Sequence, residues 1–416
     1  MELLMVPVPL FDRHIAVDSY YFRYQKGNDL LEANRSPSNE VDGAVDSPLL
    51  ETLNLVGLEA FTMGKPIFVP LNNLAMLTRL ETKCSQPPEK VVFVFDKDTK
   101  PEEEYLRNIE RLKGLGFRFA AEKLMDLDEH RPLLMLCDFI FLNAKFADCK
   151  LKLFQVKKEF PHLRVVITNI DNSDAFQRSI KEEISLLEGR FYRTPITQES
   201  DKNVSPLQAN LIKLLNLVQD ESFEFDQVAD IVQRDTALSV SLMRLVNSPW
   251  LGLRKKVKTI KHAVTILGQQ EVRKWVTTAV SKLLGSEKPD EITKLSLIRA
   301  KFCENLAEKF RLAPSAQSLF LMGLFSVLDV ILDMSMEEAL ELVMVSDSIR
   351  EALVGHTGKY YPVYDFLIHY EMADWFIVSR ILIMYDLTPG DIYECYINAA
   401  CWYRDLISGE ESSRKK

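Results

Sequence analysis

Residues 91–120 read VVFVFDKDTKPEEEYLRNIERLKGLGFRFA, and they contain a complete strand–helix–strand pattern. Val91–Phe95 is apolar at every position, which is typical of a parallel strand covered on both faces. Glu102–Gly114 carries its apolar side chains at helical spacing and ends in glycine, so it predicts an amphipathic helix. Phe117–Ala120 is the next short apolar run. The stretch therefore predicts one β-α-β unit of a buried parallel sheet.

The same alternation extends over the first ~195 residues of the chain. Short apolar runs recur about every 20–28 residues, with helical stretches between them. The further runs are Ile67–Val69, Phe139–Leu142 and Val165–Ile167. Repeated β-α units form either a closed barrel or an open doubly wound sheet, and the pattern alone leaves both open.

A polar segment without periodicity follows near residues 194–206, and we interpret it as a linker. Beyond it, Ser205, Pro206 and Gln208 have the spacing of a capping box with proline at the first helical position. No convincing strand pattern follows. The predicted organisation is an α/β domain over residues 1–196, a linker over 197–204, an all-α domain over 205–408 and a charged tail over 409–416.

The helical half is marked by helix caps and stops. The predicted ones are, in chain order, Asp235, Thr259, Gly268, Ser335 with Glu338, and Thr388 before Pro389. Leu319–Leu332 is the longest apolar-rich stretch of the chain. It is shorter than a membrane span and contains Asp329, so it predicts a buried core helix and no membrane segment.

The composition limits the class of function. The chain has 416 residues, of which 47% are hydrophobic and 27% charged, and its formal net charge is -9. Such a chain is ordered and globular, and its acidic balance opposes broad binding to nucleic acids or anionic membranes. The six cysteines form no C-x-x-C pair, and the first residues lack the basic region of a signal peptide. We therefore expect a cytoplasmic protein with reduced thiols and no zinc site.

The N-terminal half resembles the EAL domain family. The similarity lies in Pro9–Arg13 followed by Phe22 and Arg23, in Gly116–Ala120, and in Glu188–Pro195. EAL domains are (β/α)8-type barrels that hydrolyse cyclic di-GMP, so the resemblance implies a TIM-type barrel for this half. The matches cover about 190 residues, fewer than a full EAL domain usually has.

The helical half resembles the HDOD family, a helical relative of the HD phosphohydrolases that has generally lost their metal ligands. The residues that carry the resemblance are Asp235–Ser239, Leu242, Leu245, Val246–Ser248, Ile260, Ala263 and Leu267–Gly268. Tyr370–Trp375, with Tyr393 and Trp402, fits the subgroup in which an EAL domain comes first. This order of domains is the architecture of bacterial EAL–HDOD signalling proteins.

The resemblance places few suitable ligands at the positions of the EAL active site. Hydrolysis of cyclic di-GMP needs carboxylate and amide ligands for the divalent metals that activate the attacking water. The chain has, at the corresponding positions, Ser19, Pro70, Val94, Glu122, Lys123, Phe141, Asn143 and Thr168. Only Glu122, Asn143 and the nearby Asp171 could still coordinate a metal. The barrel is therefore expected to be a degenerate phosphodiesterase.

The HD-related position of the helical half shows the same loss. Ser326 and Val327 stand where the resemblance places the histidine–aspartate ligand pair. Asp329 alone cannot hold a dinuclear metal centre. We therefore expect no catalytic residues, no metal and no cofactor in either half.

The function predicted from this resemblance is signal transduction through contact with a protein partner that the sequence does not identify. The HDOD domain is the expected partner surface. One alternative is a cyclic di-GMP receptor that binds without hydrolysis, in which Arg23 contacts a phosphate. A less favoured alternative is an active phosphodiesterase with an unusual metal set.

Several other features have both a functional and a structural interpretation. They are Asp96 and Asp98 after a predicted strand, the basic run Arg254–Lys258 with Trp250, His262, and the pair His356 and His369. We interpret the two loops as solvated rather than as an active site or a nucleic-acid site. We interpret the histidines as structural or exposed rather than as partner contacts or metal ligands. The aromatic residues from Tyr360 to Tyr370 remain open between core packing and a partner-binding surface.

Overall fold

The computed structural model describes residues 3–28, 30, 48–71, 79–95, 99, 101–124, 126–182, 184–193, 206–220, 222–247 and 256–411. The chain divides into two compact units. Unit 1 contains Met1–Thr194 and Phe366–Ile397, and unit 2 contains Pro195–Asp365 and Asn398–Lys416.

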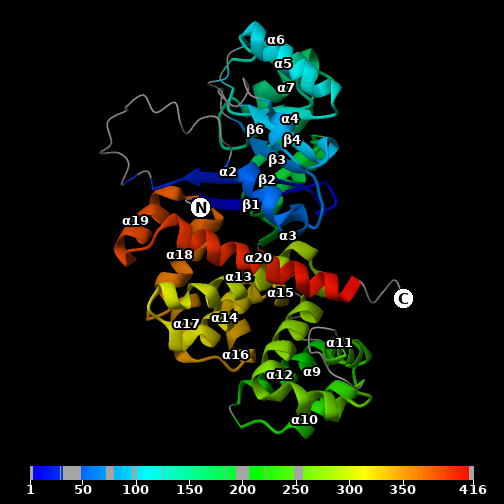
Figure 1. The fold of residues 1–416 in the computed structure, drawn as a ribbon, viewed down its shortest axis with the longest axis vertical. Coiled ribbons are helices and arrows are strands. Elements are labelled where there is room, and N and C mark those ends of the chain that lie inside the picture. Colours follow the sequence, from blue (N-terminus) through cyan, green and yellow to red (C-terminus); the bar gives the residue numbers. More distant parts are fainter. Residues whose placement is uncertain are drawn as a thin grey trace. The chain divides into compact units, whose positions relative to one another are not determined.

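Unit 1 is built around a closed barrel of eight strands in sequential order (Figure 1). The strands are β1 (Leu3–Phe11), β2 (Val17–Lys26), β3 (Ile67–Pro70), β4 (Val91–Phe95), β5 (Arg118–Ala121), β6 (Phe139–Asn143), β7 (Arg164–Ile170) and β8 (Leu186–Gly189). β1 is antiparallel to both of its neighbours, β2 and β8. All other neighbouring strands are parallel. The barrel confirms the predicted fold class and decides between the two architectures that the β-α pattern left open.

Short helices connect the parallel strands of the barrel. They are α2 (Pro48–Val56), α3 (Leu58–Thr62), α4 (Leu80–Lys83), α5 (Glu103–Gly114), α6 (Arg131–Leu136), α7 (Cys149–Glu159) and α8 (Ser173–Lys181), with 3-10 turns at Pro88–Lys90 and Phe191–Arg193. In α5, Ile109 and Leu112 are buried, as its apolar spacing predicted. The helix ends beside Gly116, whose φ of 97° few other residues adopt.

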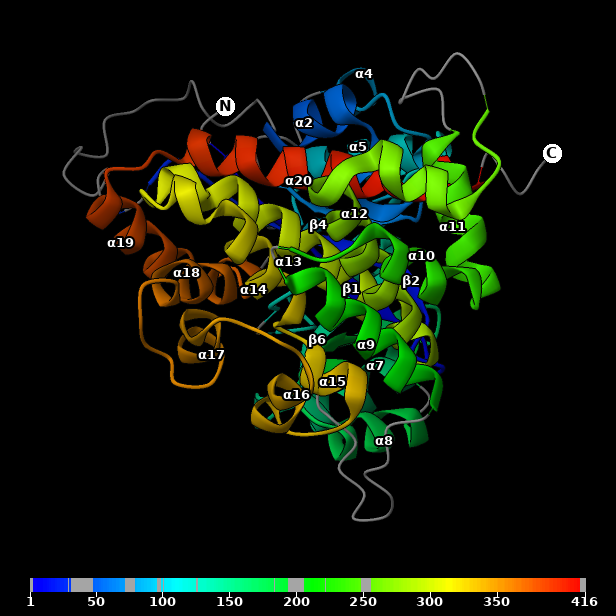
Figure 2. The ribbon, with the colours of Figure 1, turned by 90° about the horizontal axis from the view of Figure 1, so that it is seen from below.

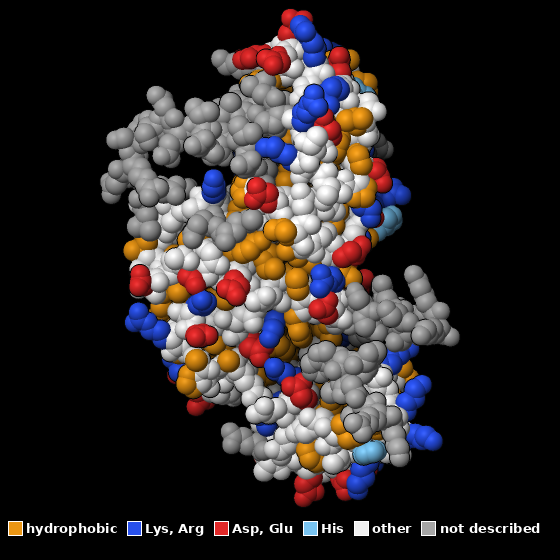
Figure 3. Space-filling model, in the orientation of Figure 1, with side chains coloured by type: hydrophobic (Ala, Val, Ile, Leu, Met, Phe, Trp, Pro, Cys, Tyr) orange, Lys and Arg blue, Asp and Glu red, His pale blue; other side chains and the backbone are white. Residues whose placement is uncertain are grey.

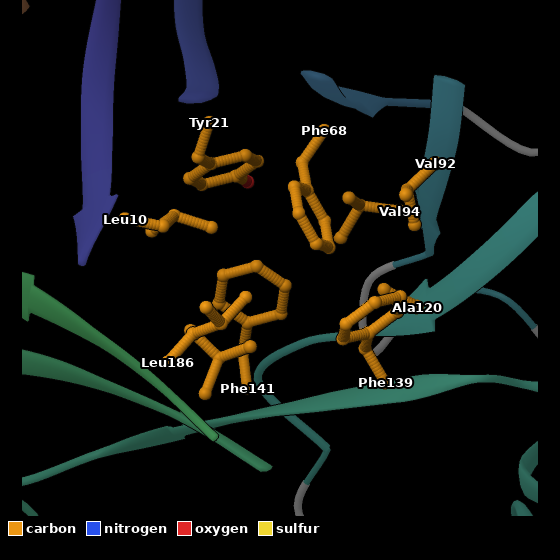
Figure 4. Close-up of a cluster of buried hydrophobic side chains, with 10 residues drawn as sticks. Leu10, Tyr21, Phe68, Val92, Val94, Ala120, Phe139, Phe141 and Leu186 are labelled. Atoms are coloured by element: carbon orange, nitrogen blue, oxygen red, sulfur yellow. The ribbon is translucent and has the colours of Figure 1, made fainter. Parts of the chain in front are cut away.

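The interior of the barrel is a packed core, as in other barrels of this size. Figure 4 shows side chains from several strands pointing toward one another inside it. The cluster consists of Leu10, Tyr21, Phe68, Val92, Val94, Ala120, Phe139, Phe141, Val166 and Leu186. The ring centroid of Phe68 lies 5.0 Å from that of Phe139, and the centroid of Phe141 lies 5.2 Å from that of Tyr21. These rings close the barrel interior and form the floor beneath its carboxyl-terminal end.

A helical segment from the end of the chain completes unit 1. It contains the end of α18 (Tyr361–Glu371), all of α19 (Trp375–Tyr385) and the start of α20 (Pro389–Glu411). In Figure 1 these helices, drawn in orange and red, lie beside β1 and β2. The stretch 205–408, which the sequence analysis assigned to one helical domain, therefore contributes to both units. The boundaries between the units fall inside α18 and α20.

Buried polar contacts hold this C-terminal segment (Phe366–Ile397) on the barrel. The Tyr370 hydroxyl donates to the carbonyl oxygen of Met5 at 2.6 Å and accepts from the Met5 amide at 3.3 Å. Arg193 forms an ion pair of 2.8 Å with Glu371, and both side chains are largely buried. These partners are far apart in the sequence, which explains why helical periodicity did not assign the segment to the barrel.

Unit 2 is helical, and its described residues contain no strand (Figure 2). Its helices are α9 (Pro206–Gln219), α10 (Phe225–Gln233), α11 (Thr236–Val246), α12 (Ile260–Leu284), α13 (Asp290–Lys309), α14 (Ala316–Phe325), α15 (Leu328–Leu332), α16 (Met336–Leu342) and α17 (Asp347–Leu353), with the start of α18 and the end of α20. No helix of the described residues is long and apolar enough to cross a membrane.

The predicted helix signals are present in the structure. Asp235 and Thr259 accept hydrogen bonds from the backbone at the starts of α11 and α12. Ser335 and Glu338 form the predicted capping box. Gly268 breaks α12 with a φ of 73°, so the helix stops there and resumes. The predicted cap at Ser205 and the linker 197–204 lie outside the described residues.

The expectation of a single core helix over Leu319–Leu332 was wrong in one respect. The stretch is buried, but it is divided into α14 and α15 by Ser326 and Val327. α14 packs closely on α13 at Gly323, where a Cβ atom would lie only 2.4 Å from the carbonyl oxygen of Arg299. Glycine is therefore required at this crossing.

Candidate functional site at the barrel mouth

A layer of polar side chains lies directly above the apolar core of the barrel. Successive residues of a strand alternate between the two faces, so the residue two positions beyond a core residue also faces the interior. The positions that follow core residues in this way are Arg23, Pro70, Glu122, Asn143, Thr168 and Glu188. They lie at the carboxyl ends of the strands, where barrels of this kind place their active sites.

This layer opens into a cavity of ≈ 660 Å³, which we call the mouth pocket. Its described lining contains four cationic side chains, Arg23, Lys26, Lys123 and Lys152, and two anionic ones, Glu122 and Asp148. Its aromatic lining consists of Tyr21, Tyr24, Phe141, Phe146 and Trp375. In the face shown in Figure 3, acidic and basic side chains are interspersed. The cationic excess of the pocket thus stands out within a chain whose formal net charge is -9.

Glu122 is the acidic residue that the sequence analysis retained as a candidate ligand, and the structure places it in the pocket. Its Oε1 lies 3.0 Å from the Lys123 Nζ, and its side chain is largely buried. Burial and the Glu122 carboxylate, which interacts with the Tyr21 hydroxyl, raise the pKa of Tyr21 well above its ordinary value. Glu122 is therefore already engaged by an ammonium group and a phenol.

Glu188 is a site residue that the sequence analysis quoted only as part of a closing motif. Its Oε2 lies 3.4 Å from a guanidinium nitrogen of Arg23 and accepts a hydrogen bond of 3.0 Å from the Asn169 amide. The next residue, Gly189, has a φ of 154°, and a Cβ there would lie 2.0 Å from the Ile170 carbonyl oxygen. This glycine lets β8 pass close to β7 and positions Glu188 below Arg23.

The other predicted ligand positions divide into three groups. Asn143, Thr168, Pro70 and Lys123 line the pocket with Glu122. Phe141 lines it and also belongs to the apolar core, whereas Val94 belongs to the core without lining the pocket. Asp171 does not line the pocket, and it pairs with Lys145 at 2.8 Å. Ser19 is fully buried, and its hydroxyl has no hydrogen-bond partner among the described residues.

The described residues contain no group of three or more His, Cys, Asp or Glu side chains that could hold a metal ion. Asp96 and Asp98 lie outside these residues, directly after β4. Among the described residues of the mouth layer, only Glu122 and Glu188 carry carboxylates, and each has a cationic side chain within 4 Å.

The HD-related position in unit 2 is a compact polar cluster rather than a pocket. Arg299 donates from a guanidinium nitrogen to the Ser326 hydroxyl at 2.9 Å, and that hydroxyl donates to the Gly323 carbonyl at 2.6 Å. Arg299, Ser326 and Val327 are all buried. Burial raises the pKa of the nearby Asp329 carboxyl. The polar groups of this cluster hold helices together.

The remaining candidates are not brought together as a site. His356 stacks on Tyr364, and His369 instead contacts Asp374, with 3.1 Å between its Nδ1 and the carboxylate. His262 is exposed. In the basic run, Lys256 and Lys258 are exposed, and residues 250–255 lie outside the described residues. Among the aromatics that were left open, Tyr360, Phe366 and Tyr370 are buried and belong to the core.

Comparison with known proteins bears on both units. The HDOD domain model matches residues 204–353. The uncharacterized protein YuxH of Bacillus subtilis is 25% identical over 419 residues, covering 99% of this chain and all of that protein. The cyclic di-GMP phosphodiesterase CdgJ of Vibrio cholerae is 24% identical over 392 residues, covering 92% of this chain and 90% of that protein. Among solved structures, an EAL domain protein from Listeria monocytogenes matches 46% of this chain and 87% of its own, with 10% identity and a TM-score of 0.36.

The helical half thus contains an HDOD domain, as its motifs predicted. The closed eight-stranded barrel before it is the fold expected of the EAL domain that the N-terminal half resembles.

Proposed function

We propose that this EAL–HDOD chain transduces a signal by binding and does not hydrolyse cyclic di-GMP. The observation that carries the proposal is the chemistry of the mouth layer. Glu122 is paired with Lys123, and Glu188 is paired with Arg23. The third carboxylate near the pocket, Asp148 of its lining, pairs with Lys152 at 2.9 Å, so each of these carboxylates has a cationic partner within the protein itself.

Water activation for phosphodiester hydrolysis needs a divalent cation held by several oxygen ligands. A metal at Glu122 would have to displace or repel the Lys123 ammonium group. Pro70 provides no side-chain oxygen, and Asp171 is engaged by Lys145 outside the pocket lining. The described residues thus support a pocket that attracts anions more readily than metal cations.

The test is a product assay of the purified full chain with cyclic di-GMP and either magnesium or manganese. We expect no turnover above the buffer control, with an authentic EAL phosphodiesterase as the positive control. Turnover that a chelator removes would overturn the proposal. In that case, Asp96→Asn and Asp98→Asn would show whether the loop after β4 supplies the metal ligands.

The pocket also favours a second function, the binding of an anionic nucleotide without cleavage. Four cationic side chains and an indole line one cavity, and cyclic di-GMP has two phosphates and two planar bases. A guanidinium matches the geometry of a phosphate, which makes Arg23 the candidate contact. Calorimetry with cyclic di-GMP tests this function. We expect binding that weakens at least tenfold in Arg23→Ala, since a charge-assisted hydrogen bond contributes about 1.5–3 kcal/mol. Absence of heat at millimolar ligand would exclude it.

The output of the signal is proposed to be contact between the HDOD domain and a protein partner. Two observations support this. The HDOD match covers most of unit 2, and Ser326, which the resemblance places with Val327 at the HD ligand pair, accepts a hydrogen bond from Arg299. The full chain should retain a specific protein in affinity capture, and charge reversal at the exposed Lys256 and Lys258 should weaken a salt-dependent contact at that loop. Equal retention by the reversed variant would remove this loop from the partner surface.

A further inference from the structure

Two residues of the mouth pocket do not come from the barrel. Ala373 and Trp375 belong to the junction between α18 and α19, within the C-terminal segment Phe366–Ile397. The rest of the described lining comes from the barrel strands and the segments that follow them. One wall of the cavity is thus supplied by a part of the chain that follows the HDOD match, which ends at residue 353.

The position of Trp375 is supported by the buried side chain of Tyr370. Its ring meets that of Tyr370 edge to face, with 5.7 Å between the centroids. Tyr370 is fully buried, and its hydroxyl is bound to both backbone groups of Met5 in β1. Trp375 itself is half-buried, so part of its indole faces the cavity. Its neighbour Phe376 is 63% exposed and does not line the pocket.

The connection between the two helices fixes where α19 begins. Ala373 has a φ of 54°, in the left-handed region, and its amide donates to the Tyr370 carbonyl at 3.0 Å. Asp374 then caps α19 by accepting from the Ile377 amide at 3.3 Å, and its other carboxylate oxygen contacts His369 at 3.1 Å. The tryptophan therefore follows a short turn whose conformation is set by several hydrogen bonds.

We propose that Trp375 stacks on a planar base of a nucleotide bound in the mouth pocket, and that the C-terminal segment thereby senses whether the pocket is occupied. Aromatic stacking serves any base, while the cationic side chains serve the phosphates. An inorganic anion would gain nothing from the indole, and a neutral aromatic compound would gain nothing from Arg23, Lys26 or Lys152. The proposal rests on the nucleotide binding described above.

Stacking at this position has a consequence for the rest of the chain. Trp375 begins α19, which lies wholly in unit 1, whereas its support Tyr370 belongs to α18, whose first residues belong to the unit that contains the HDOD match. A ligand that immobilises Trp375 immobilises the junction Ala373–Trp375 as well. The segment is a covalent route from the barrel pocket to the signalling half of the chain.

The test measures cyclic di-GMP affinity by calorimetry for the full chain and three variants. Trp375→Ala should lose about tenfold or more, the range expected for one lost base–aromatic stack. Trp375→Phe should retain affinity within about threefold, because a smaller aromatic ring still stacks. Phe376→Ala is the matched control and should bind as the unchanged chain does, since this side chain faces away from the pocket.

A second readout follows the indole directly. With Trp250, Trp275 and Trp402 replaced by phenylalanine, the ligand should quench or shift the emission of the remaining Trp375, and hydrogen exchange should slow over residues 366–385. Binding that Trp375→Ala leaves unchanged, or an emission that the ligand does not alter, would overturn the inference while leaving nucleotide binding intact. If the unchanged chain binds no cyclic di-GMP, nucleotide binding itself fails, and the stacking role fails with it.

Discussion

The barrel mouth of unit 1 and the Arg299–Ser326 cluster of unit 2 are two positions where family resemblance places metal ligands, and the chain treats them differently. The mouth remains a cavity of ≈ 660 Å³ lined by charged side chains. The cluster in unit 2 is buried, and its polar atoms bind one another and the backbone. Two positions to which the resemblance assigns metal ligands can therefore differ, one lining an open pocket and the other belonging to the core. Only the first outcome leaves something for a ligand to bind.

The largest effect is expected when one methyl group is added beside the Arg299–Ser326 cluster, where α13 and α14 cross. Gly323→Ala would place a Cβ 2.4 Å from the Arg299 carbonyl oxygen, and the neighbouring atoms are helix backbone that cannot yield cheaply. We expect a loss of about 3 kcal/mol or more in unfolding free energy, measured by chemical denaturation. Gly114→Ala is the control, because a Cβ there meets nothing within 4 Å. A loss below about 1 kcal/mol for Gly323→Ala would show that the crossing of α13 and α14 is looser than described.

Replacing two buried serines, one in each unit, tests whether their hydroxyl groups contribute differently to stability. Ser326 accepts from Arg299 and donates to Gly323, so Ser326→Ala should cost about 1–3 kcal/mol by leaving a buried guanidinium nitrogen with fewer partners. Ser19 is fully buried, and its hydroxyl has no partner among the described residues. Ser19→Ala should therefore be neutral or stabilising by up to about 1 kcal/mol. Thermal unfolding of both variants decides. Similar losses at the two sites would mean that the Ser19 hydroxyl is satisfied by buried water.

The carboxyl of Asp329 gives the filled cluster a pH dependence. Burial raises its pKa in the folded chain, so the folded state keeps a proton that the unfolded chain has released. The free energy of unfolding should accordingly fall as pH rises from about 3.9, the ordinary pKa of aspartate, and the cost is fully present above the raised pKa. Asp329→Asn should raise the melting temperature more at pH 7 than at pH 3.5. An equal change at both pH values would contradict the assigned cause.

The smallest effect is expected at the open mouth. Lys123 is 65% exposed and adopts a φ of 56°, which favours glycine. Its ion pair with Glu122 is worth little at such exposure. Lys123→Gly should therefore change stability by less than about 1 kcal/mol, in either direction. Differential scanning calorimetry measures this, and a loss of several kcal/mol would show that the mouth is as tightly determined as the cluster in unit 2.

Local pattern predicted the parts of the fold that local physics determines. β4 begins and ends at the predicted residues, and α5 begins one residue later than predicted. Both predictions succeeded because an apolar run and an amphipathic period indicate directly which side chains of a segment are buried. β8 carries no such signal, since Leu186–Gly189 is short and follows a charged helix end. The need for glycine at position 189 could not be predicted, because it arises from the close approach of the Ile170 backbone. β1 and β2 were recognised through family resemblance alone.

The sequence analysis named some residues that line the pocket but did not predict how the pocket is assembled. Arg23, Glu122 and Asn143 were named from the resemblance and do lie around one pocket. Glu188 and Trp375 were quoted only as members of longer motifs, and neither was named as a residue of the site. Nothing in a helical period shows that Tyr370 will meet Met5, because the contact joins residues 365 positions apart. A spacing of that length carries no periodic signal.

The hydrogen bonds between Tyr370 and Met5 also determine when, during synthesis of the chain, this contact can form. The strand that contains Met5 leaves the ribosome first, and the side chain that seals its edge is made 365 residues later. Until then, the backbone groups of β1 that Tyr370 binds have to be satisfied by water or by other molecules. This contact thus forms only after residues 204–353, which match the HDOD domain, have been translated. A product that stops before Tyr370 would leave these two backbone groups of β1 without this partner.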